Sequence, residues 1–380
     1  MTKTTTWRVL AAAAATTLLL SACGTTGGDG GDAGGSADAG GSCDLAIGYM
    51  GALTGDAANL GTNMLNGVKL AVDEHNKESD CKVEIVQFDS QGLPDVATPL
   101  AAEAINNEKV VGLVGPSFSG ETDATGAAFA EAGLVTVSPS ATNPKLSTNG
   151  WDTFHRVLGN DSVQGPQAAA YITGTGAEKV FVVDDASDYG KGIAENVAAT
   201  LGDAVVETDT IQQKQTDFGP TVTKVLAADA DALFFGGYYA EGGLLMKQLR
   251  AGGWEGTFVS GDGSLDAGFV EAAGADAAEG AVLTCPCAPS PEDFTAAFKA
   301  LNGVDPGTYS AEAYDATNVL LDGIDAGSTD RAKLLEFVNA YDEEGITKQV
   351  KFDETGEVAE VVVYAYTVKD GKIQPGEPIE

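Results

Sequence analysis

The chain has 380 residues, of which 43% are hydrophobic, an ordinary fraction for a folded protein. Its formal net charge is −35 at pH 7, with 56 acidic residues against 21 basic ones. This excess of acid argues against nucleic acids and other large polyanions as partners, because phosphate binding needs clustered lysine and arginine. The length is sufficient for two domains of ordinary size.

The first 22 residues have the organisation of an export signal. Lys3 and Arg8 precede an apolar run (9–20), and Leu-Ser-Ala-Cys at 20–23 completes the pattern. The run is shorter than the ~20 residues that a membrane-spanning helix needs. The cysteine resembles that of the bacterial lipoprotein lipobox. This resemblance implies cleavage before Cys23, lipidation of its thiol, and an extracytoplasmic protein held to the cell membrane only by acyl chains.

The following stretch has the composition of a linker. Residues 24–42 are almost all Gly, Ala, Ser, Thr and Asp, and none has a large apolar side chain. We therefore expect residues 23–42 to form a flexible tether with a root-mean-square reach of roughly 25 Å.

Four cysteines remain for the folded part, and an even number in an exported protein favours disulfides. They are Cys43, Cys81, Cys285 and Cys287. Each of the first two lies four residues before an isoleucine in a predicted strand, so they can form a bridge if these strands are parallel neighbours. A bridge across the single residue between the last two would be strained, and their pairing stays open. We expect no metal site there, because neither histidine lies at ligand spacing.

Predicted strands alternate with predicted helices along the chain. The first series has strands at 45–49, 83–86, 110–114 and 134–137 and helices at 65–75 and 96–105. A second series begins after Gly165, with strands at 180–183, 204–211, 232–235 and 257–259 and helices at 192–201, 218–226 and 244–249. The last part has helices at 294–301, 309–324 and 332–341 and strands at 349–352 and 361–368. This pattern predicts an α/β fold of two lobes, each a parallel sheet flanked by helices.

Polar turns follow several of the strands, where ligands of such sheets bind. These turns are residues 115–122, 138–144, 236–239 and 260–263. In the first, serine and threonine side chains can cap the next helix, and its free N–H groups suit a carboxylate or another small anion. The last places Asp262 just beyond its strand. Together the turns predict a cleft for a small ligand.

An enzymatic function is not expected. Ser117 and Ser119 follow a strand as a hydrolase nucleophile would, but Ser119 occupies the last glycine position of the Gly-x-Ser-x-Gly elbow. Neither His75 nor His155 has a visible acidic partner to make it a general base. No phosphate-binding Gly-x-x-x-x-Gly-Lys-Ser/Thr loop is present either, so we expect no cofactor.

Several short segments resemble, in order and spacing, those of the branched-chain amino-acid-binding proteins, extracytoplasmic receptors of ABC importers. They are Gly-Ala-Leu-Thr-Gly (51–55), Val-Gly-Pro-Ser-Phe-Ser (114–119), Val-Ser-Pro-Ser-Ala-Thr (137–142), Phe-His-Arg (154–156), Asn-Asp-Ser-Val-Gln-Gly (160–165), Asp-Tyr-Gly (188–190), Phe-Gly-Gly-Tyr (235–238) and Leu-Arg-Ala-Gly (249–252). The resemblance implies a monomer of two lobes joined by three hinge crossovers. Lobe one would hold residues 43–160 and 286–353, and lobe two residues 161–285 and 354–380.

The same resemblance implies how the polar residues contact a ligand. Ser119 would bind a carboxylate through its hydroxyl and N–H. Thr142 would contact both the carboxylate and the ammonium group, and the Ser140 carbonyl would accept from the ammonium. Asp262 falls where these proteins place an acidic residue against the ammonium, usually the longer glutamate.

The apolar part of the ligand would be enclosed by other residues. Tyr189 and Tyr238 would close over it from the second lobe, Leu60 and Phe118 would line the side-chain pocket, and Ala141 belongs to the same site. The resemblance favours a branched-chain or other aliphatic amino acid, delivered to the subunits of an ABC permease. An amide, a urea-like molecule or a small aromatic acid is the alternative, and so is a role in sensing.

Overall fold

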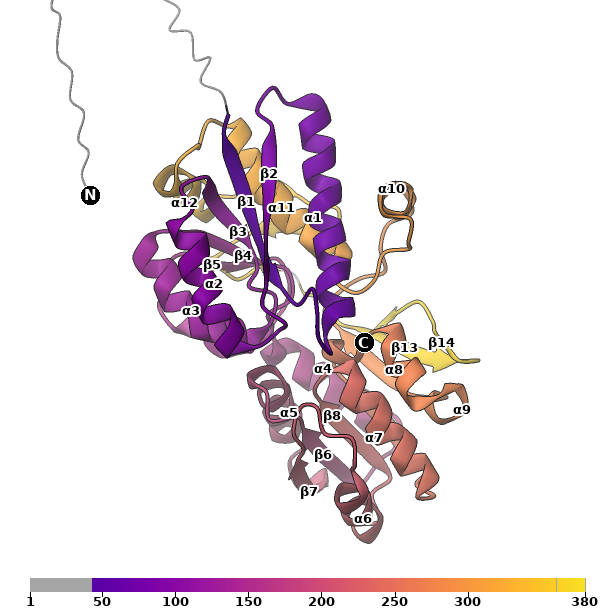
Figure 1. The fold of residues 1–380 in the computed structure, drawn as a ribbon. Coiled ribbons are helices and arrows are strands. Elements are labelled where there is room, and N and C mark those ends of the chain that lie inside the picture. Colours follow the sequence, from indigo (N-terminus) through magenta and orange to yellow (C-terminus); the bar gives the residue numbers. More distant parts are fainter. Residues whose placement is uncertain (1–42, 360, 380) are drawn as a thin grey trace, which may run out of the picture. The chain divides into compact units, whose positions relative to one another are not determined.

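The computed structural model describes residues 43–359 and 361–379. The expected export signal, the lipidated Cys23 and the tether lie outside the described residues. Within the described part of the chain, no helix is both long and apolar enough to cross a membrane. Two main β-sheets are flanked by helices, which confirms the α/β fold class (Figure 1).

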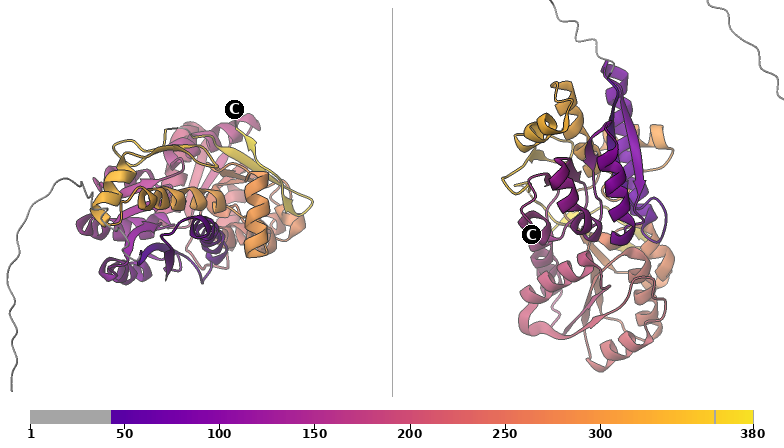
Figure 2. Two further views of the ribbon diagram at one scale, coloured as in Figure 1. Left: turned by 90° about the horizontal axis from the view of Figure 1, so that it is seen from above. Right: turned by 60° about the vertical axis from the view of Figure 1, so that its left-hand side comes forward.

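The first sheet has five parallel strands in the order β2-β1-β3-β4-β5. The strands are β1 (Leu45–Gly51), β2 (Val83–Asp89), β3 (Val110–Val114), β4 (Val135–Ser138) and β5 (Phe154–Arg156). The helices beside it are α1 (Ala58–Glu78), α2 (Pro94–Asn106), α3 (Ser119–Ala132), α11 (Ser310–Asp325) and α12 (Arg331–Asn339). Successive side chains of a strand point to opposite faces. Helices α2 and α3 lie on one side of the sheet and α1 and α11 on the other (Figures 1 and 2). Ala46 and Met50 pack with α2 and α3, whereas Ile47 and Tyr49 pack with α1 and α11.

The second sheet is mixed. Its path is β14-β13-β10-β9-β8-β6-β7, with β15 paired to β13. The strands are β6 (Val180–Asp184), β7 (Val205–Thr210), β8 (Ala232–Gly236), β9 (Thr257–Ser260), β10 (Val282–Cys285), β13 (Tyr364–Lys369), β14 (Lys372–Ile373) and β15 (Glu377–Pro378). The strands from β6 to β10 are parallel, but β13 runs antiparallel to β10. The expectation of a wholly parallel sheet is therefore corrected, because the final segment of the chain returns beside β10 in the opposite direction.

The helices of the second half pack mainly around this sheet. They are α4 (Asp161–Gly174), α5 (Asp188–Leu201), α6 (Gly219–Ala227), α7 (Tyr239–Ala251), α8 (Ala267–Ala273) and α9 (Ala275–Ala278), and α10 (Glu292–Asn302) lies against α1. Sequence patterns predicted neither α4 nor β5. Helix α4 contains Gly165 and Pro166, which are poor helix formers, and its buried face is made of small residues such as Ala168 and Ala169. Strand β5 has only three residues.

The chain passes between the two sheets three times, after β5, after β10 and after a small hairpin. This hairpin, β11 (Asp342–Glu344) with β12 (Gln349–Lys351), is antiparallel. At the second passage, a disulfide joins Cys285 to Cys287, and both residues are buried. At the third, Glu357 forms an ion pair with the fully buried Arg156.

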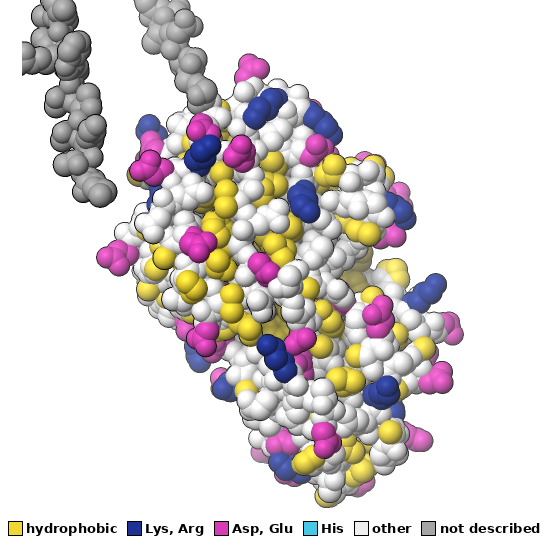
Figure 3. Space-filling view, viewed as in Figure 1, with side chains coloured by type: hydrophobic (Ala, Val, Ile, Leu, Met, Phe, Trp, Pro, Cys, Tyr) yellow, Lys and Arg dark blue, Asp and Glu magenta, His cyan; other side chains and the backbone are white. Residues whose placement is uncertain are grey.

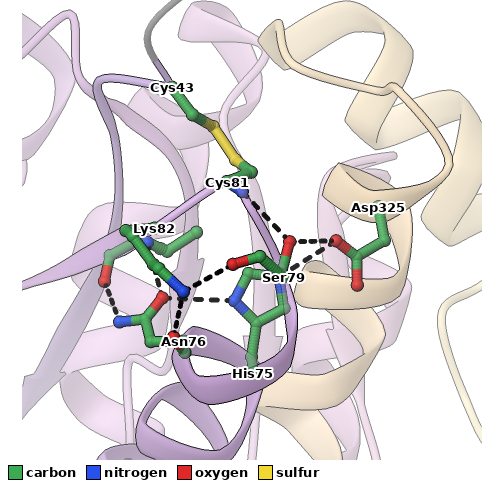
Figure 4. Close-up of a disulfide and its surroundings, with 8 residues drawn as sticks. Cys43, His75, Asn76, Ser79, Cys81, Lys82 and Asp325 are labelled. Atoms are coloured by element: carbon green, nitrogen blue, oxygen red, sulfur yellow. Dashed lines mark hydrogen bonds and ion pairs between the residues drawn. A yellow bond between two sulfur atoms is a disulfide. The ribbon is translucent and has the colours of Figure 1, made fainter.

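A second disulfide joins Cys43 to Cys81, just ahead of β1 and β2 (Figure 4). The parallel register of these strands pairs Leu45 with Val83 and so brings the two cysteines side by side. Ser79 connects this corner to α11, because its hydroxyl donates to Asp325 (3.0 Å) and accepts from the Cys81 N–H (3.2 Å). The disulfide therefore fixes the edge of the first sheet opposite the carboxyl ends of its strands.

Charged side chains are dispersed over the surface. On the face shown in Figure 3, acidic groups stand mostly singly among uncharged ones rather than in one patch. The large negative charge therefore does not by itself mark a binding site on this face.

Candidate functional site

A small cavity lies at the carboxyl ends of strands from both sheets. Seven of the residues that the family resemblance implies as ligand contacts line it, namely Leu60, Phe118, Ser119, Ser140, Tyr189, Tyr238 and Asp262. Four further lining residues are Met64, Ser117, Gly263 and Tyr309. The turns after β3, β4, β8 and β9 thus meet at one place, as expected for sheets of this kind.

The turn after β3 presents helix N–H groups to the cavity. Helix α3 begins at Ser119, and the first N–H groups of a helix have no partner within it. The expected serine or threonine cap is not found. Instead, the Glu121 carboxylate accepts from the N–H groups of Ser117 (2.7 Å) and Phe118 (2.9 Å). Ser119 lines the cavity at the positive end of the α3 dipole, a position that suits a small anion.

The turn after β4 lies beside this helix start. Ser140 lines the cavity, whereas Ala141 and Thr142 are fully buried and do not belong to the lining. The Ala141 carbonyl accepts from the Arg156 guanidinium (2.7 Å), which fixes this turn. The Thr142 hydroxyl makes no hydrogen bond to any described residue, so it remains available to a ligand that penetrates this far.

The second sheet contributes aromatic rings and an acid. The Tyr189 hydroxyl donates to Asp262 Oδ1 (2.9 Å) and accepts from the Gly263 N–H (2.9 Å). The Tyr238 ring lies 5.2 Å from the ring of Tyr189 and 5.5 Å from that of Phe118, measured between centroids. These rings give the cavity an apolar wall beside the buried carboxylate of Asp262.

Sequence analysis missed Asp161, the first residue of α4. Its side chain is fully buried, and neither carboxylate oxygen has a hydrogen-bond partner among the described residues. Its N–H donates to the Thr142 carbonyl (2.9 Å), so the two residues lie together. Burial and the neighbouring charge of Asp262 raise the pKa of Asp161 well above its usual value. The segment Asn-Asp-Ser-Val-Gln-Gly (160–165) is part of the family resemblance, but no feature of it singles out Asp161, which lies near Asp262 without belonging to the cavity lining.

Tyr309 was also missed. It precedes α11 with a φ of +64°, a left-handed conformation that tyrosine rarely adopts, and its side chain is buried in the wall of the cavity. The sequence offered no signal for a role of Tyr309 in the site, because it lies 165 residues after the nearest predicted turn of the first lobe (138–144). Only the packing of α11 against α1 brings it to the site.

The arrangement suits a small molecule that carries both charges. The cavity wall carries the buried carboxylate of Asp262, with that of Asp161 nearby, and the described lining contains no lysine or arginine, although the charge of the buried Arg156 partly offsets the rise in the pKa of Asp161. Burial also raises the pKa of Asp262, and such a pair is strongly stabilised by a cation that lies between them. Hydroxyls and helix N–H groups opposite them suit a carboxylate.

Two sheets whose strand ends share one small polar cavity define a solute-binding protein. Comparison with known sequences agrees with this class. The chain belongs to the periplasmic binding protein family, whose sequence profile matches residues 44–372. The family resemblance inferred from the short segments is thereby confirmed.

Relatives with assigned functions are similar over most of their length. The Leu/Ile/Val-binding protein BraC3 of Rhizobium johnstonii is 33% identical over 347 residues, covering 88% of this chain and 94% of that protein. A leucine-, isoleucine-, valine-, threonine- and alanine-binding protein of Pseudomonas aeruginosa is 30% identical, covering 83% and 87%. The branched-chain amino acid transporter substrate-binding protein LivJ of Streptococcus pneumoniae, solved with isoleucine, is 30% identical, with a TM-score of 0.82 over 88% of this chain and 99% of that one.

Proposed function

We propose that this protein captures a branched-chain or other aliphatic amino acid outside the cytoplasm and delivers it to an ABC import permease. The observation that carries the proposal is the buried carboxylate of Asp262 in the wall of a small cavity that Ser119, the first residue of α3, also lines, with the buried Asp161 close to Asp262. Relatives about 30% identical that bind leucine, isoleucine and valine support this choice of solute.

The polar groups of the ligand would be divided between the two sheets. Its carboxylate lies against the hydroxyl and N–H of Ser119, where the helix dipole favours a negative charge. Its ammonium group lies between Asp161 and Asp262 and donates further hydrogen bonds to the Thr142 hydroxyl and the Ser140 carbonyl. An amide or a deaminated acid would satisfy only one of these two ends.

The side chain of the ligand would occupy the apolar part of the cavity. Leu60 and Met64 come from α1, Phe118 from the turn after β3, and Tyr238 from the turn after β8. Rings and branched aliphatic groups around a short cavity favour a compact apolar side chain over a long or charged one. We therefore favour leucine, isoleucine and valine as ligands.

Capture would use a hinge between lobe one (43–160 and 286–353) and lobe two (161–285 and 354–380). Contacts already join the two sheets beside the cavity, since the Asn59 side-chain amide donates to Asp266 (2.8 Å) and that of Asn143 to the Asp188 carbonyl (2.7 Å). A ligand that touches both sides favours the closed arrangement. We further propose that the receptor is a monomer anchored through a lipidated Cys23.

Isothermal titration calorimetry of the purified protein tests the proposal. Leucine, isoleucine and valine are compared with leucinamide, 4-methylpentanoate, urea and benzoate. We expect the amino acids to bind at least about 100-fold more tightly than analogues that lack either charge. Equal affinity for leucinamide, or binding of benzoate without binding of any aliphatic amino acid, would replace the proposed ligand with one of the alternatives.

A further inference from the structure

A second, larger cavity lies on the far side of Tyr309. Its volume is about 600 Å³, within the range of small-molecule sites. Tyr309 lines both cavities, so they share one wall. The walls come from both halves of the fold, with Asn63 of α1 and the start of α11 on one side and Leu265, Ala267 and Tyr366 on the other.

The lining of this cavity is acidic. Asp266, Asp305 and Glu312 border it, and no lysine or arginine is among the described residues that do. Two of the three acids already have partners. Asp266 accepts from the Asn59 side chain (2.8 Å) and the Gly268 N–H (2.7 Å), and the exposed Asp305 pairs with Lys299 (2.8 Å).

Glu312 differs from the other two acids. Only 2% of its surface is exposed, and its Oε1 atom has no hydrogen-bond partner among the described residues. Burial raises its pKa to about 7 even though the charge of Lys348, which is partly buried, opposes the rise. Lys348 forms no ion pair within 4 Å in the described part of the chain. The neighbouring Asp315, by contrast, accepts from the N–H groups of Ile346 (2.9 Å) and Thr347 (3.0 Å).

A buried carboxylate oxygen without a hydrogen bond is costly, and Lys348 lies too far from Glu312 for an ion pair, so a cation that enters the cavity would reduce that cost. The cation is not a metal ion, because no three acidic, histidine or cysteine side chains of the described residues gather closely enough to hold one. Apolar side chains such as Leu265, Ala288 and Pro289 line the same space and suit methylene groups. The walls therefore match a molecule with an aliphatic chain and a positively charged end.

We propose that this cavity is a second binding site, for a small aliphatic amine whose ammonium group pairs with Glu312. Because the walls come from both halves of the fold, a bound amine favours the arrangement in which these halves are together. It then raises the affinity of the first cavity for its own ligand, and that ligand raises the affinity for the amine by the same factor.

Calorimetric titration with n-butylamine and 1,4-diaminobutane tests the proposal, with isoleucine present at saturation to fill the first cavity. We expect Glu312→Gln, which keeps the shape of the side chain but removes its charge, to weaken amine binding at least tenfold. Asp305→Asn removes an exposed acid of the same cavity and is the matched control, with a change of less than about threefold. Isoleucine affinity measured without amine reports whether each variant is folded.

Two results would overturn the second site. One is unchanged amine affinity in Glu312→Gln. The other is displacement of the amine by isoleucine, which would place it between Asp161 and Asp262 of the first cavity. Failure of isoleucine to bind would instead contradict the proposed function, and the comparison of Glu312→Gln with Asp305→Asn would still decide the amine site.

Discussion

The two walls of the small cavity, one from each sheet, differ in the chemical groups that they present. On the side of the first sheet, hydroxyls and helix N–H groups at fixed backbone positions surround Ser119 and Ser140. On the side of the second sheet, the rings of Tyr189 and Tyr238 surround the carboxylate of Asp262. The first wall donates hydrogen bonds, whereas the second accepts a positive charge and covers apolar surface. For the zwitterion proposed as ligand, this difference predicts one orientation, with the carboxylate at the first wall and the ammonium group at the second.

Removing the acid of the second wall should have the largest effect on affinity. Asp262→Ala is expected to weaken leucine binding by about 100-fold or more, because the ammonium group loses a buried charged partner. Calorimetry with 4-methylpentanoate is the control, since this molecule has no ammonium group and should lose little. If both ligands lost affinity equally, Asp262 would support the fold of the site rather than the amine.

A substitution in the first wall should weaken binding of the carboxylate end of the ligand. Ser119→Ala removes one hydroxyl but leaves the backbone N–H in place, so a loss of about 10- to 100-fold for leucine is expected. Leucinamide has no negative charge at that end and should be less sensitive to the change. Equal sensitivity of the two molecules in the same titration would contradict a carboxylate contact.

The pH of the solution should also affect the stability of the ligand-free protein. Burial raises the pKa of Glu121, Asp185 and Glu312 to about 7, so the folded state holds protons there that the unfolded state releases nearer pH 4. Stability from these groups is complete below pH 4 and is lost as the pH rises through 7. Buried His155 has a lowered pKa and acts in the opposite direction, but it is a single group, and the raised pKa values of Asp161 and Asp262 add to the effect of these three carboxyls.

We therefore expect the melting temperature without ligand to fall by a few degrees between pH 5 and pH 8. Glu121→Gln has no titrating group at this position, so its melting temperature should depend less steeply on pH. Differential scanning calorimetry can measure the difference. A melting temperature that rises steadily over the same interval would show that the buried carboxyls do not govern stability there.

The smallest effect on ligand affinity is expected from a substitution far from both walls of the cavity. Replacing Cys43 and Cys81 by serine removes the disulfide at the opposite edge of the first sheet and should cost about 2–4 kcal/mol of stability. Leucine affinity, measured well below the new melting temperature, should stay within about twofold. A larger loss would mean that the edge of the sheet and the turn before α3 are mechanically connected.

Much of this fold could be predicted from sequence because its signals are local. The apolar strand 110–114 and the glycine- and serine-rich turn that follows it appear where the pattern placed them. Helix α4 was missed because its buried face is made of small residues, which give a weak apolar stripe. The antiparallel direction of β13 depends on the path of the whole chain, and no local pattern encodes it.

The site was less predictable than the fold. Ser119 and Asp262 follow predicted strands, so strand-end reasoning was sufficient to select them. Asp161 begins a helix that sequence analysis did not predict, and Tyr309 reaches the cavity through packing between helices distant in sequence. Residues that depend on such long-range packing are not marked by spacing or composition.

The position of the cavity also bears on how such receptors diversify. The groups that surround it, Ser140, Tyr238 and Asp262 among them, lie in turns after strands, while the strands themselves supply the core. Substitutions in these turns can change which nutrient is recognised at little cost to folding. Such receptors could therefore acquire new ligands through exchanges at a few positions in these turns, with the strands of both sheets unchanged.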